Sequence, residues 1–398
     1  MATSSRLRVL ILLAACVSAI VWAAVASDVE TVDWAGFATD TTLASPSTSR
    51  FATSASTTSR PTTTIPTTTA PLELSPFARL EGFTTVNAYD PPGEGFSLWQ
   101  QAVPRIEDIR FTSTADGTEQ PALWLPPLVQ TPAPLLVVVH SWSLGYFQGS
   151  SMPYAAWADL NGWAMIAPDF RGANLRPEAT GSDLAVQDVI DAIDFAMAHG
   201  EIDENRVFVI GYSGGGMMSL LVAGRHPDRI TGAVSWVPVY DLLDWYGYVR
   251  QNDVGSYGEQ ILASCGGDPT IPGEAQESCR HRSPSAHLEG AAQAGVPIYI
   301  GHGLSDSTVP PDYAIRAFDQ LVEPADRLGP DFSNSVREHV VPDSVLGSVE
   351  AETYFQTGEP VVWFSRSSGP VTVVLFDGAH DMVYHPGLAW IYEAATSP

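Results

Sequence analysis

The sequence predicts an α/β fold with a mostly parallel, doubly wound sheet and helices on both faces. Short apolar segments alternate with stretches of helical periodicity, and each apolar segment is too uniform to have a solvent-facing side. Strands of this kind belong to parallel sheets that are covered on both faces. The segments expected to be strands are 135–139, 163–167, 207–210, 233–238, 297–301 and 371–376.

The clearest helix is expected between Ser182 and Gly200. Its sequence, SDLAVQDVIDAIDFAMAHG, repeats apolar residues at three and four positions, which is the spacing of one helix face. The glycine at the end favours termination there. The predicted buried face consists of Val186, Val189, Ile190, Ile193 and Met197.

The first 75 residues are expected to lie outside the folded domain. Residues 1–26 have two arginines, an apolar run and a final Ala-Val-Ala, the pattern of a secretory signal peptide. An uncleaved membrane anchor and a lipid-modified Cys16 are the alternatives. Residues 27–75 are rich in Thr, Ser and Pro and predict a disordered stalk that could tether the protein to a cell surface. A secreted chain with its folded domain at 76–398 is the resulting expectation.

Composition limits the partners and the redox chemistry. The formal net charge is −26, from 45 acidic residues and 19 basic ones that are all arginine, which disfavours nucleic acid and anionic membranes as partners. In an exported chain, Cys265 and Cys279 are expected to form a disulfide, with two free thiols as the alternative. Two cysteines without nearby histidines make a poor zinc site, so no metal is expected.

A serine between glycines marks the candidate site. The stretch VFVIGYSGGGM contains Gly211, Tyr212, Ser213, Gly214 and Gly215, which fit the G-x-S-x-G pattern of a nucleophile elbow. In that sharp strand-to-helix turn, side chains two positions before and after the serine would collide with the neighbouring strand and helix. The turn lifts the hydroxyl to the carboxyl edge of the sheet, beside free N–H groups of the helix. An ordinary small-residue turn is the alternative, but the flanking strand and helix favour the elbow.

The serine needs a base and an acid, which in this fold class follow it in the order acid, then histidine. Asp306 follows the strand 297–301, and His380 follows the strand 371–376. Both therefore lie at carboxyl ends of strands, where catalytic groups gather. The sequence predicts a triad of Ser213, Asp306 and His380.

Other residues could take these roles. Asp241 and Asp244 follow an earlier strand and are alternative acids, and His385 is an alternative base. His140 and His302 are expected to be structural.

The oxyanion that forms on attack by a serine needs two hydrogen-bond donors. We expect one to be the backbone N–H of Gly214, directly after the serine, and the other to come from the loop after the strand 135–139, which reads His140-Ser141-Trp142. Four aromatic residues either line a substrate pocket or simply pack near the sheet edge: Tyr146, Tyr240, Trp245 and Tyr246.

Six segments together carry a family resemblance: VVVHSW, APDFRGAN, GSDLAVQDVIDAIDFA, VIGYSGGGMMSLLVAGRHPDRITGAVSWVPVYDL, GHGLSDSTVP and FDGAHDM. Over residues 105–398 the chain resembles the catalytic domain of the prolyl oligopeptidase family of serine peptidases, in the α/β-hydrolase superfamily. The resemblance implies that Ser213 is the nucleophile, Asp306 the acid and His380 the base. It also implies that the N–H of Trp142 contributes to the oxyanion hole.

Three features depart from the family pattern. His140-Ser141-Trp142 stands where the family has His-Gly-Gly. The spacing from Asp306 to His380 is 74 residues, longer than is usual in the family, and predicts an extra flap near 325–368. About 30 residues, 76–105, separate the stalk from the hydrolase core, which leaves no room for a β-propeller. The segment 247–290 is expected to form a cap loop over the site.

The expected function is therefore hydrolysis of peptide bonds through a covalent acyl-enzyme, without a metal or an organic cofactor. A carboxylic ester hydrolase on the same fold is the first alternative. A non-catalytic binding module is the second, and it is disfavoured because all three catalytic residue types are present in the expected order.

Overall fold

The computed structural model describes residues 86–87, 95–128, 131–342, 354–355 and 360–396. The predicted signal peptide and stalk, and the possible lipidation site Cys16, lie outside these residues. Among the described helices, none combines the length and the apolar character that a membrane span requires.

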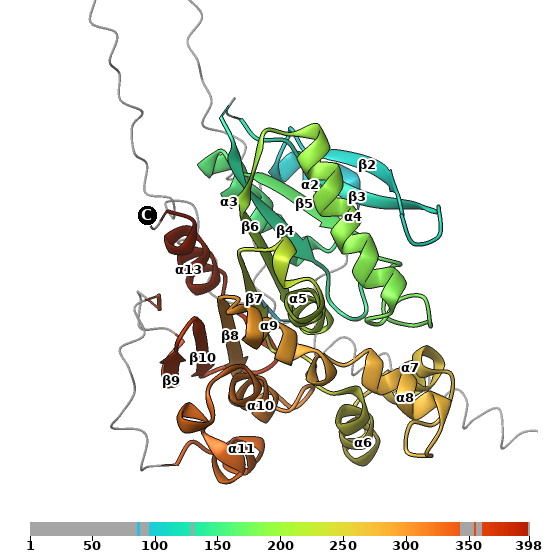
Figure 1. Cartoon of the computed structure of the whole chain (residues 1–398), viewed down its shortest axis with the longest axis vertical. Helices are drawn as coiled ribbons and strands as arrows, with labels where there is room; N and C mark the ends of the chain where they lie inside the picture. The colour runs from blue at the N-terminus through green and yellow to red at the C-terminus, as the bar shows by residue number, and fades with distance from the viewer. Residues whose placement is uncertain (1–85, 88–94, 129–130, 343–353, 356–359, 397–398) are drawn as a thin grey trace, which may run out of the picture. The chain divides into compact units, whose positions relative to one another are not determined.

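The centre of this part of the chain is a nine-stranded sheet with the order β2-β3-β5-β4-β6-β7-β8-β10-β9 (Figure 1). Six neighbouring strands of this sheet, in the order β5-β4-β6-β7-β8-β10, run parallel to one another. Each of the six overlaps a segment that the sequence predicts to be a strand. They are β4 (Ala133–Val139), β5 (Ala164–Pro168), β6 (Ile202–Tyr212), β7 (Gly232–Trp236), β8 (Ile298–Gly303) and β10 (Val371–Phe376).

Three antiparallel strands at the two sides of the sheet were not predicted. β2 pairs with β3, β3 pairs with β5, and β9 pairs with β10. β2 is largely exposed and β9 is only partly buried, so both lack the continuous apolar run that identifies an inner strand. β9 falls within 325–368, so this part of the predicted flap is instead an edge strand of the sheet. The three strands are β2 (Glu107–Thr112), β3 (Glu119–Leu125) and β9 (Val362–Ser368).

A second, two-stranded sheet joins the start of the described chain to its last part. β1 (Val86–Asn87) pairs antiparallel with β11 (Asp381–Met382). β11 begins one residue after His380, so this small sheet flanks the loop that carries the predicted base.

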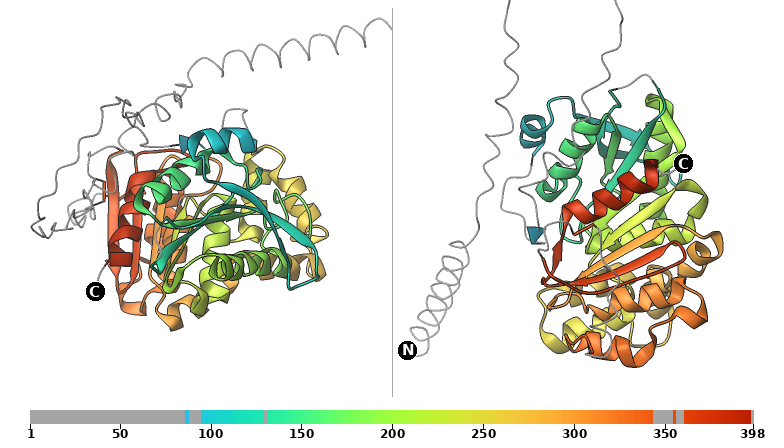
Figure 2. Two further views of the ribbon diagram at one scale, coloured as in Figure 1. Left: turned by 90° about the horizontal axis from the view of Figure 1, so that it is seen from above. Right: turned by 90° about the vertical axis from the view of Figure 1, so that its left-hand side faces the viewer.

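Helices cover both faces of the large sheet, as the sequence predicts (Figures 1 and 2). Figure 2 (left) shows α3 and α13 on one side of the sheet and α4 and α5 on the other. α10 packs against β8 and β10. The bounds of these helices are α3 (Met152–Asn161), α4 (Asp183–His199), α5 (Gly214–Arg225), α10 (Asp312–Leu321) and α13 (Tyr384–Thr396).

α4 is the helix predicted between Ser182 and Gly200. The Ser182 side chain caps it by accepting a hydrogen bond from the backbone N–H of Ala185 at 3.0 Å. Of the predicted apolar face, the first four residues are buried and Met197, in the last turn, is partly buried. The periodicity of the sequence therefore identifies the face that packs on the sheet.

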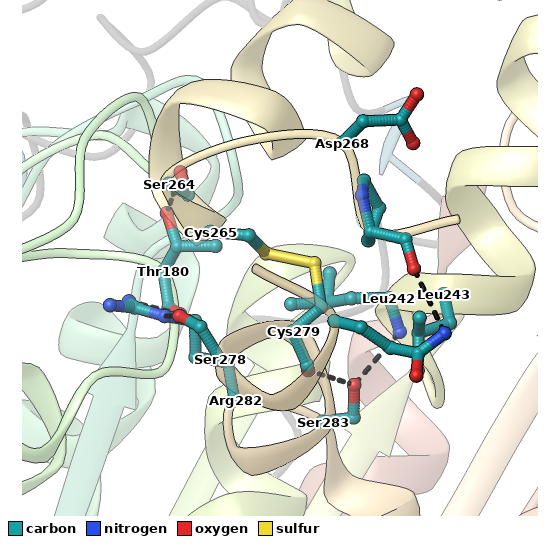
Figure 3. The surroundings of a disulfide bond; sticks show 12 residues. Thr180, Leu242, Leu243, Ser264, Cys265, Asp268, Ser278, Cys279, Arg282 and Ser283 are labelled. Atoms are coloured by element: carbon teal, nitrogen blue, oxygen red, sulfur yellow. Dashed lines mark hydrogen bonds between the residues drawn. A yellow bond between two sulfur atoms is a disulfide. The ribbon is translucent and has the colours of Figure 1, made fainter. Parts of the chain in front are cut away.

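The segment 247–290 is helical rather than the loop that was predicted. Helices α6, α7 and α8 pack in sequence, and α9 packs on α5. A bond between the sulfur atoms of Cys265, at the end of α7, and Cys279, in α8, links these two helices (Figure 3). The bounds are α6 (Leu242–Asn252), α7 (Tyr257–Cys265), α8 (Glu274–His281) and α9 (Leu288–Ala294); the remaining helices are α2 (Phe96–Ala102) and α11 (Gly329–Arg337).

Candidate active site

Ser213 stands at the tip of the turn between β6 and α5. Its backbone has φ 57° and ψ −120°, a sparsely populated conformation that costs about 1–3 kcal/mol. A Cβ atom on Gly211 would lie 2.6 Å from the carbonyl of Gly215, and one on Gly215 would lie 2.3 Å from the carbonyl oxygen of Val139. Both positions must be glycine because the strand and the helix approach each other so closely there. The turn thus has the shape that the sequence predicts.

His380 lies on the loop after β10 and reaches both predicted partners. Its Nε2 is 2.9 Å from Oγ of Ser213, and its Nδ1 is 2.7 Å from Oδ2 of Asp306. Because a carboxylate only accepts hydrogen bonds, Nδ1 carries the proton and Nε2 is free to accept the serine proton. The exposed fractions of the three residues are 6% for Ser213, 5% for His380 and 0% for Asp306.

The Asp306 carboxylate is held on both of its oxygens. Oδ1 accepts hydrogen bonds from the backbone N–H groups of Thr308 at 2.8 Å and Val309 at 2.9 Å. Oδ2 lies 3.1 Å from Nε2 of His302 and also accepts the hydrogen bond from His380. Burial alone raises the pKa of this carboxyl, but the charge interaction with His380 and the hydrogen bonds from both histidines outweigh it. The pKa of Asp306 therefore lies below its ordinary value, and the carboxyl group is ionised at neutral pH.

The loops that carry Asp306 and His380 are fixed to each other through their backbones. The N–H of Leu304 donates to the carbonyl of Phe376 at 2.8 Å, and the N–H of Ser305 donates to the carbonyl of Gly378 at 2.8 Å. These bonds continue the pairing of β8 with β10 beyond the ends of the strands. The positions of acid and base are thereby coupled.

The alternative acids and base have other partners. Asp241 caps α6, because one of its oxygens accepts two backbone N–H groups of the first turn. Asp244 pairs with Arg316 at 2.7 Å and Arg337 at 2.9 Å. His385 forms its hydrogen bond through Nδ1 with a backbone carbonyl at 2.9 Å. These contacts give each of the three a structural role.

The two predicted oxyanion donors lie next to each other. A Cβ atom on Gly214 would be 2.6 Å from the backbone nitrogen of Trp142, so glycine is the residue that fits. The carbonyl of Trp142 accepts the N–H of Asn174 at 2.7 Å, and the indole N–H of Trp142 donates to Oε1 of Gln260 in α7 at 2.7 Å. Trp142 is therefore anchored at its backbone and its side chain.

Trp245 is the predicted pocket residue that contacts this region. Its ring meets the Trp142 ring edge-on, with 4.8 Å between ring centroids. Its indole N–H donates to the carbonyl of Thr308, on the Asp306 loop, at 2.9 Å. Trp245 in α6 thus links the loop of the oxyanion donor to the loop of the acid.

The other three aromatic candidates contact different elements. The hydroxyl of Tyr146 is 3.3 Å from a carboxylate oxygen of Asp108 in β2. The hydroxyl of Tyr240 donates to Gln320 in α10 at 2.8 Å, and Tyr246 belongs to the buried core. These contacts favour packing roles over one common pocket wall.

The structure adds residues that the sequence motifs did not indicate: Asn174, Arg171, Gln260 and the contact of His302 with Asp306. The roles of the first three depend on contacts with segments distant in the sequence, which no local pattern indicates. No group of His, Cys, Asp and Glu among the described residues has an arrangement that could hold a metal ion.

Comparison with known proteins finds similarity to one peptidase family and to individual hydrolases. The sequence model of the prolyl oligopeptidase family matches residues 153–342. This range is 190 of the 398 residues, so the family model matches just under half of the chain. The matched range includes Ser213 and Asp306, and His380 lies beyond its end.

Two curated relatives represent two kinds of hydrolase. Acylamino-acid-releasing enzyme 2 of Oryza sativa subsp. japonica is 24% identical over 269 residues, covering 63% of this chain and 33% of the relative. Feruloyl esterase B of Thermothelomyces thermophilus is 26% identical over 118 residues, covering 27% of this chain and 39% of the relative. The matches span between 18% and 39% of the length of these and other curated relatives.

Two solved structures to which the chain is similar are a peptidase and an esterase. The Pyrococcus horikoshii acylaminoacyl peptidase has a TM-score of 0.44 and 21% identity, covering 54% of this chain and 34% of that one. The acetyl xylan esterase from Paenibacillus sp. R4 has a TM-score of 0.43 and 20% identity, covering 60% and 79%.

Proposed function

We propose that this protein is a serine hydrolase that cleaves peptide bonds through a covalent acyl-enzyme. The observation that carries the proposal is the hydrogen-bonded series from Ser213 Oγ through His380 to Asp306, with the serine on a strained turn. This arrangement is the one that nucleophilic catalysis by serine requires. The family of residues 153–342 supports the same reaction class.

In the first half of the reaction, Ser213 Oγ attacks the substrate carbonyl while Nε2 of His380 takes the serine proton. Asp306 keeps the imidazole in the correct tautomer and stabilises its charged form. The oxyanion is bound by the N–H groups of Gly214 and Trp142. His380 then gives its proton to the leaving group, and the acyl group remains on Ser213.

In the second half, His380 takes a proton from water, which attacks the acyl-enzyme. The tetrahedral species collapses, the acid product leaves, and the proton returns to Ser213. The proton exchange between Ser213 and His380 in this scheme uses two atoms that lie 2.9 Å apart in the structure.

Hydrolysis of carboxylic esters is the second candidate function. The same triad serves an alcohol leaving group, and the similarity to feruloyl esterase B favours an ester. Peptide hydrolysis is the first hypothesis because residues 153–342 match the model of a peptidase family. In addition, acylamino-acid-releasing enzyme 2 aligns over a larger part of the chain than feruloyl esterase B does.

We also propose that the protein acts outside the cell. The signal-peptide pattern of residues 1–26 and the Thr-rich stalk support export, and an anchored N-terminus is the alternative. A peptide or small-molecule substrate is the partner that this proposal requires.

Turnover of matched substrates tests the proposal. Purified full-length protein is assayed with an N-acetylated amino acid aminomethylcoumarin amide and with p-nitrophenyl acetate, beside Ser213→Ala. We expect hydrolysis of the amide and a loss on the order of 10⁶-fold in kcat for the variant. If only the ester is hydrolysed, the peptidase hypothesis is wrong and the esterase hypothesis is supported. Equal rates for wild type and Ser213→Ala would contradict both.

A further inference from the structure

A strained loop between β5 and α4 brings Asn174 to the site. Phe170 has φ 29° and Arg171 has φ 80°, a region that non-glycine residues rarely adopt. Arg171 holds the loop in place through ion pairs with Asp188, which is fully buried, and with Asp116. The strain indicates that the position of this loop is fixed by its surroundings rather than by its own preference.

The side chain of Asn174 has a defined orientation. It is fully buried, and its Oδ1 accepts the backbone N–H of Thr180 at 2.8 Å. Since a backbone N–H only donates, the oxygen must face Thr180 and the NH₂ group must point the other way. Thr180 is itself fixed by Ser264, whose hydroxyl lies 2.8 Å from its own, and by Arg282 (Figure 3).

The NH₂ group points at the nucleophile turn. A Cβ atom on Gly214 would lie 2.9 Å from Nδ2 of Asn174 and 2.6 Å from the backbone nitrogen of Trp142. Within the described residues, Nδ2 has no hydrogen-bond partner. An unpaired buried donor costs about 1–3 kcal/mol, so its retention beside two oxyanion donors indicates a ligand atom that accepts from it.

We infer that Asn174 is a catalytic residue whose side-chain amide is the third donor of the oxyanion hole. The inference rests on the proposed hydrolase function. Asn174 acts twice, because its backbone N–H also holds the carbonyl of Trp142 at 2.7 Å and so orients the neighbouring donor. A buried amide that is already oriented needs no reorganisation when the charge develops.

The chemical step needs no proton from Asn174. When Ser213 Oγ bonds to the substrate carbon, the carbonyl π bond breaks and its electron pair becomes the oxyanion. The serine proton moves to Nε2 of His380. Asn174 Nδ2, with the N–H groups of Gly214 and Trp142, donates hydrogen bonds to the oxyanion, and these bonds weaken when the carbonyl re-forms.

The test uses two Asn174 variants of the full-length protein. Asn174→Asp keeps the oxygen that accepts from Thr180 but replaces the donor by a second oxygen. Asn174→Ala removes both. Asn205→Ala, at an exposed position of β6, is the matched control. We measure the rate constant for phosphonylation of Ser213 by a fluorophosphonate probe, kcat and KM for p-nitrophenyl acetate, and thermal unfolding.

We expect both Asn174 variants to lose about 10²–10³-fold in phosphonylation rate and in kcat, with KM within about threefold of wild type. Unfolding temperatures close to that of wild type would show that the loss is not caused by misfolding. Asn205→Ala should match wild type in every measurement. Rates of both variants within threefold of wild type would overturn the inference.

A pH series separates a donor role from a structural one. A buried carboxyl has a raised pKa, and its protonated form can donate a hydrogen bond. The phosphonylation rate of wild type divided by that of Asn174→Asp should therefore decrease towards one as the pH is lowered from 8 to 5. A ratio that stays constant would assign Asn174 a structural role and overturn the inference. If wild type itself is not phosphonylated, the hydrolase proposal fails as well, so the two failures are distinguishable.

Discussion

Asp306 illustrates how much a single residue can depend on its neighbours. It is fully buried, yet its two oxygens accept hydrogen bonds from two backbone N–H groups and from His302 and His380. A buried carboxylate without these donors would be unstable in its charged form. The second imidazole, His302, is a contact that the order of residues along the chain did not predict.

The lowered pKa of Asp306 gives a prediction for the pH dependence of stability. A carboxyl whose pKa falls on folding stabilises the native state above its ordinary pKa of 3.8, and this contribution is lost as the pH falls through the lower folded value. We expect the decrease in unfolding free energy between pH 7 and pH 3 to be smaller for Asp306→Asn than for wild type. Urea unfolding at both pH values measures it, and kcat of the variant should fall about 10⁴-fold. The same pH dependence in both proteins would contradict this account of the carboxylate.

At the scale of elements, the site depends on how closely α5 approaches the end of β4. A Cβ atom built on Gly211, Gly214 or Gly215 would lie 2.6, 2.6 or 2.3 Å, respectively, from a backbone atom of a neighbouring segment. The contact that matters most is between Gly215 and the last carbonyls of β4, because it sets the position of the loop that contains Trp142. The elbow glycines therefore allow Ser213 and the proposed oxyanion donors to lie together.

Two glycine substitutions in helices test this contact. A Cβ atom on Gly215 would lie 2.3 Å from the carbonyl oxygen of Val139, whereas one on Gly247 in α6 would have nothing within 4 Å. We expect Gly215→Ala to lower the unfolding free energy by about 1–3 kcal/mol or more. Gly247→Ala, the control, should raise it by about 0.5–1 kcal/mol, because alanine favours helix. A Gly215→Ala protein as stable as wild type would show that the helix can move away from the strand.

The helical segment 247–290 contacts the candidate site through α7. Gln260 of α7 holds the indole of Trp142, and Ser264, one residue before the linked Cys265, contacts Thr180 (Figure 3). The sequence predicted that a disulfide-containing segment lies over the site, but it predicted a loop. The helices α6, α7 and α8 have 11, 9 and 8 residues, against 17 in α4, so each offers fewer turns in which a helical repeat can be recognised.

At the scale of the whole molecule, the parallel sheet brings distant segments to one edge. Ser213 and His380 are 167 residues apart in sequence, and their side chains are 2.9 Å apart. This meeting could be predicted because Ser213, Asp306 and His380 each follow an apolar strand of the same parallel sheet. The apolar runs that identify the strands also place the loops.

What could not be predicted has a common physical cause. The edge strands β2 and β9 bury only part of their side chains, so their sequences lack a continuous apolar run. Asn174 reaches the site through a loop with positive φ angles, and no local pattern in APDFRGAN indicates where its side chain points. Long-range contacts of single polar side chains are visible only once the fold is known.

Labelling with a fluorophosphonate probe tests the central claim, that the triad is assembled and reactive in this chain. Purified full-length wild type and Ser213→Ala are incubated with the probe, and the labelled peptide is identified by mass spectrometry. We predict that wild type is modified at Ser213 and that the variant is not modified. An unlabelled wild-type protein, or a label on another residue, would contradict the assignment of Ser213 as the activated nucleophile.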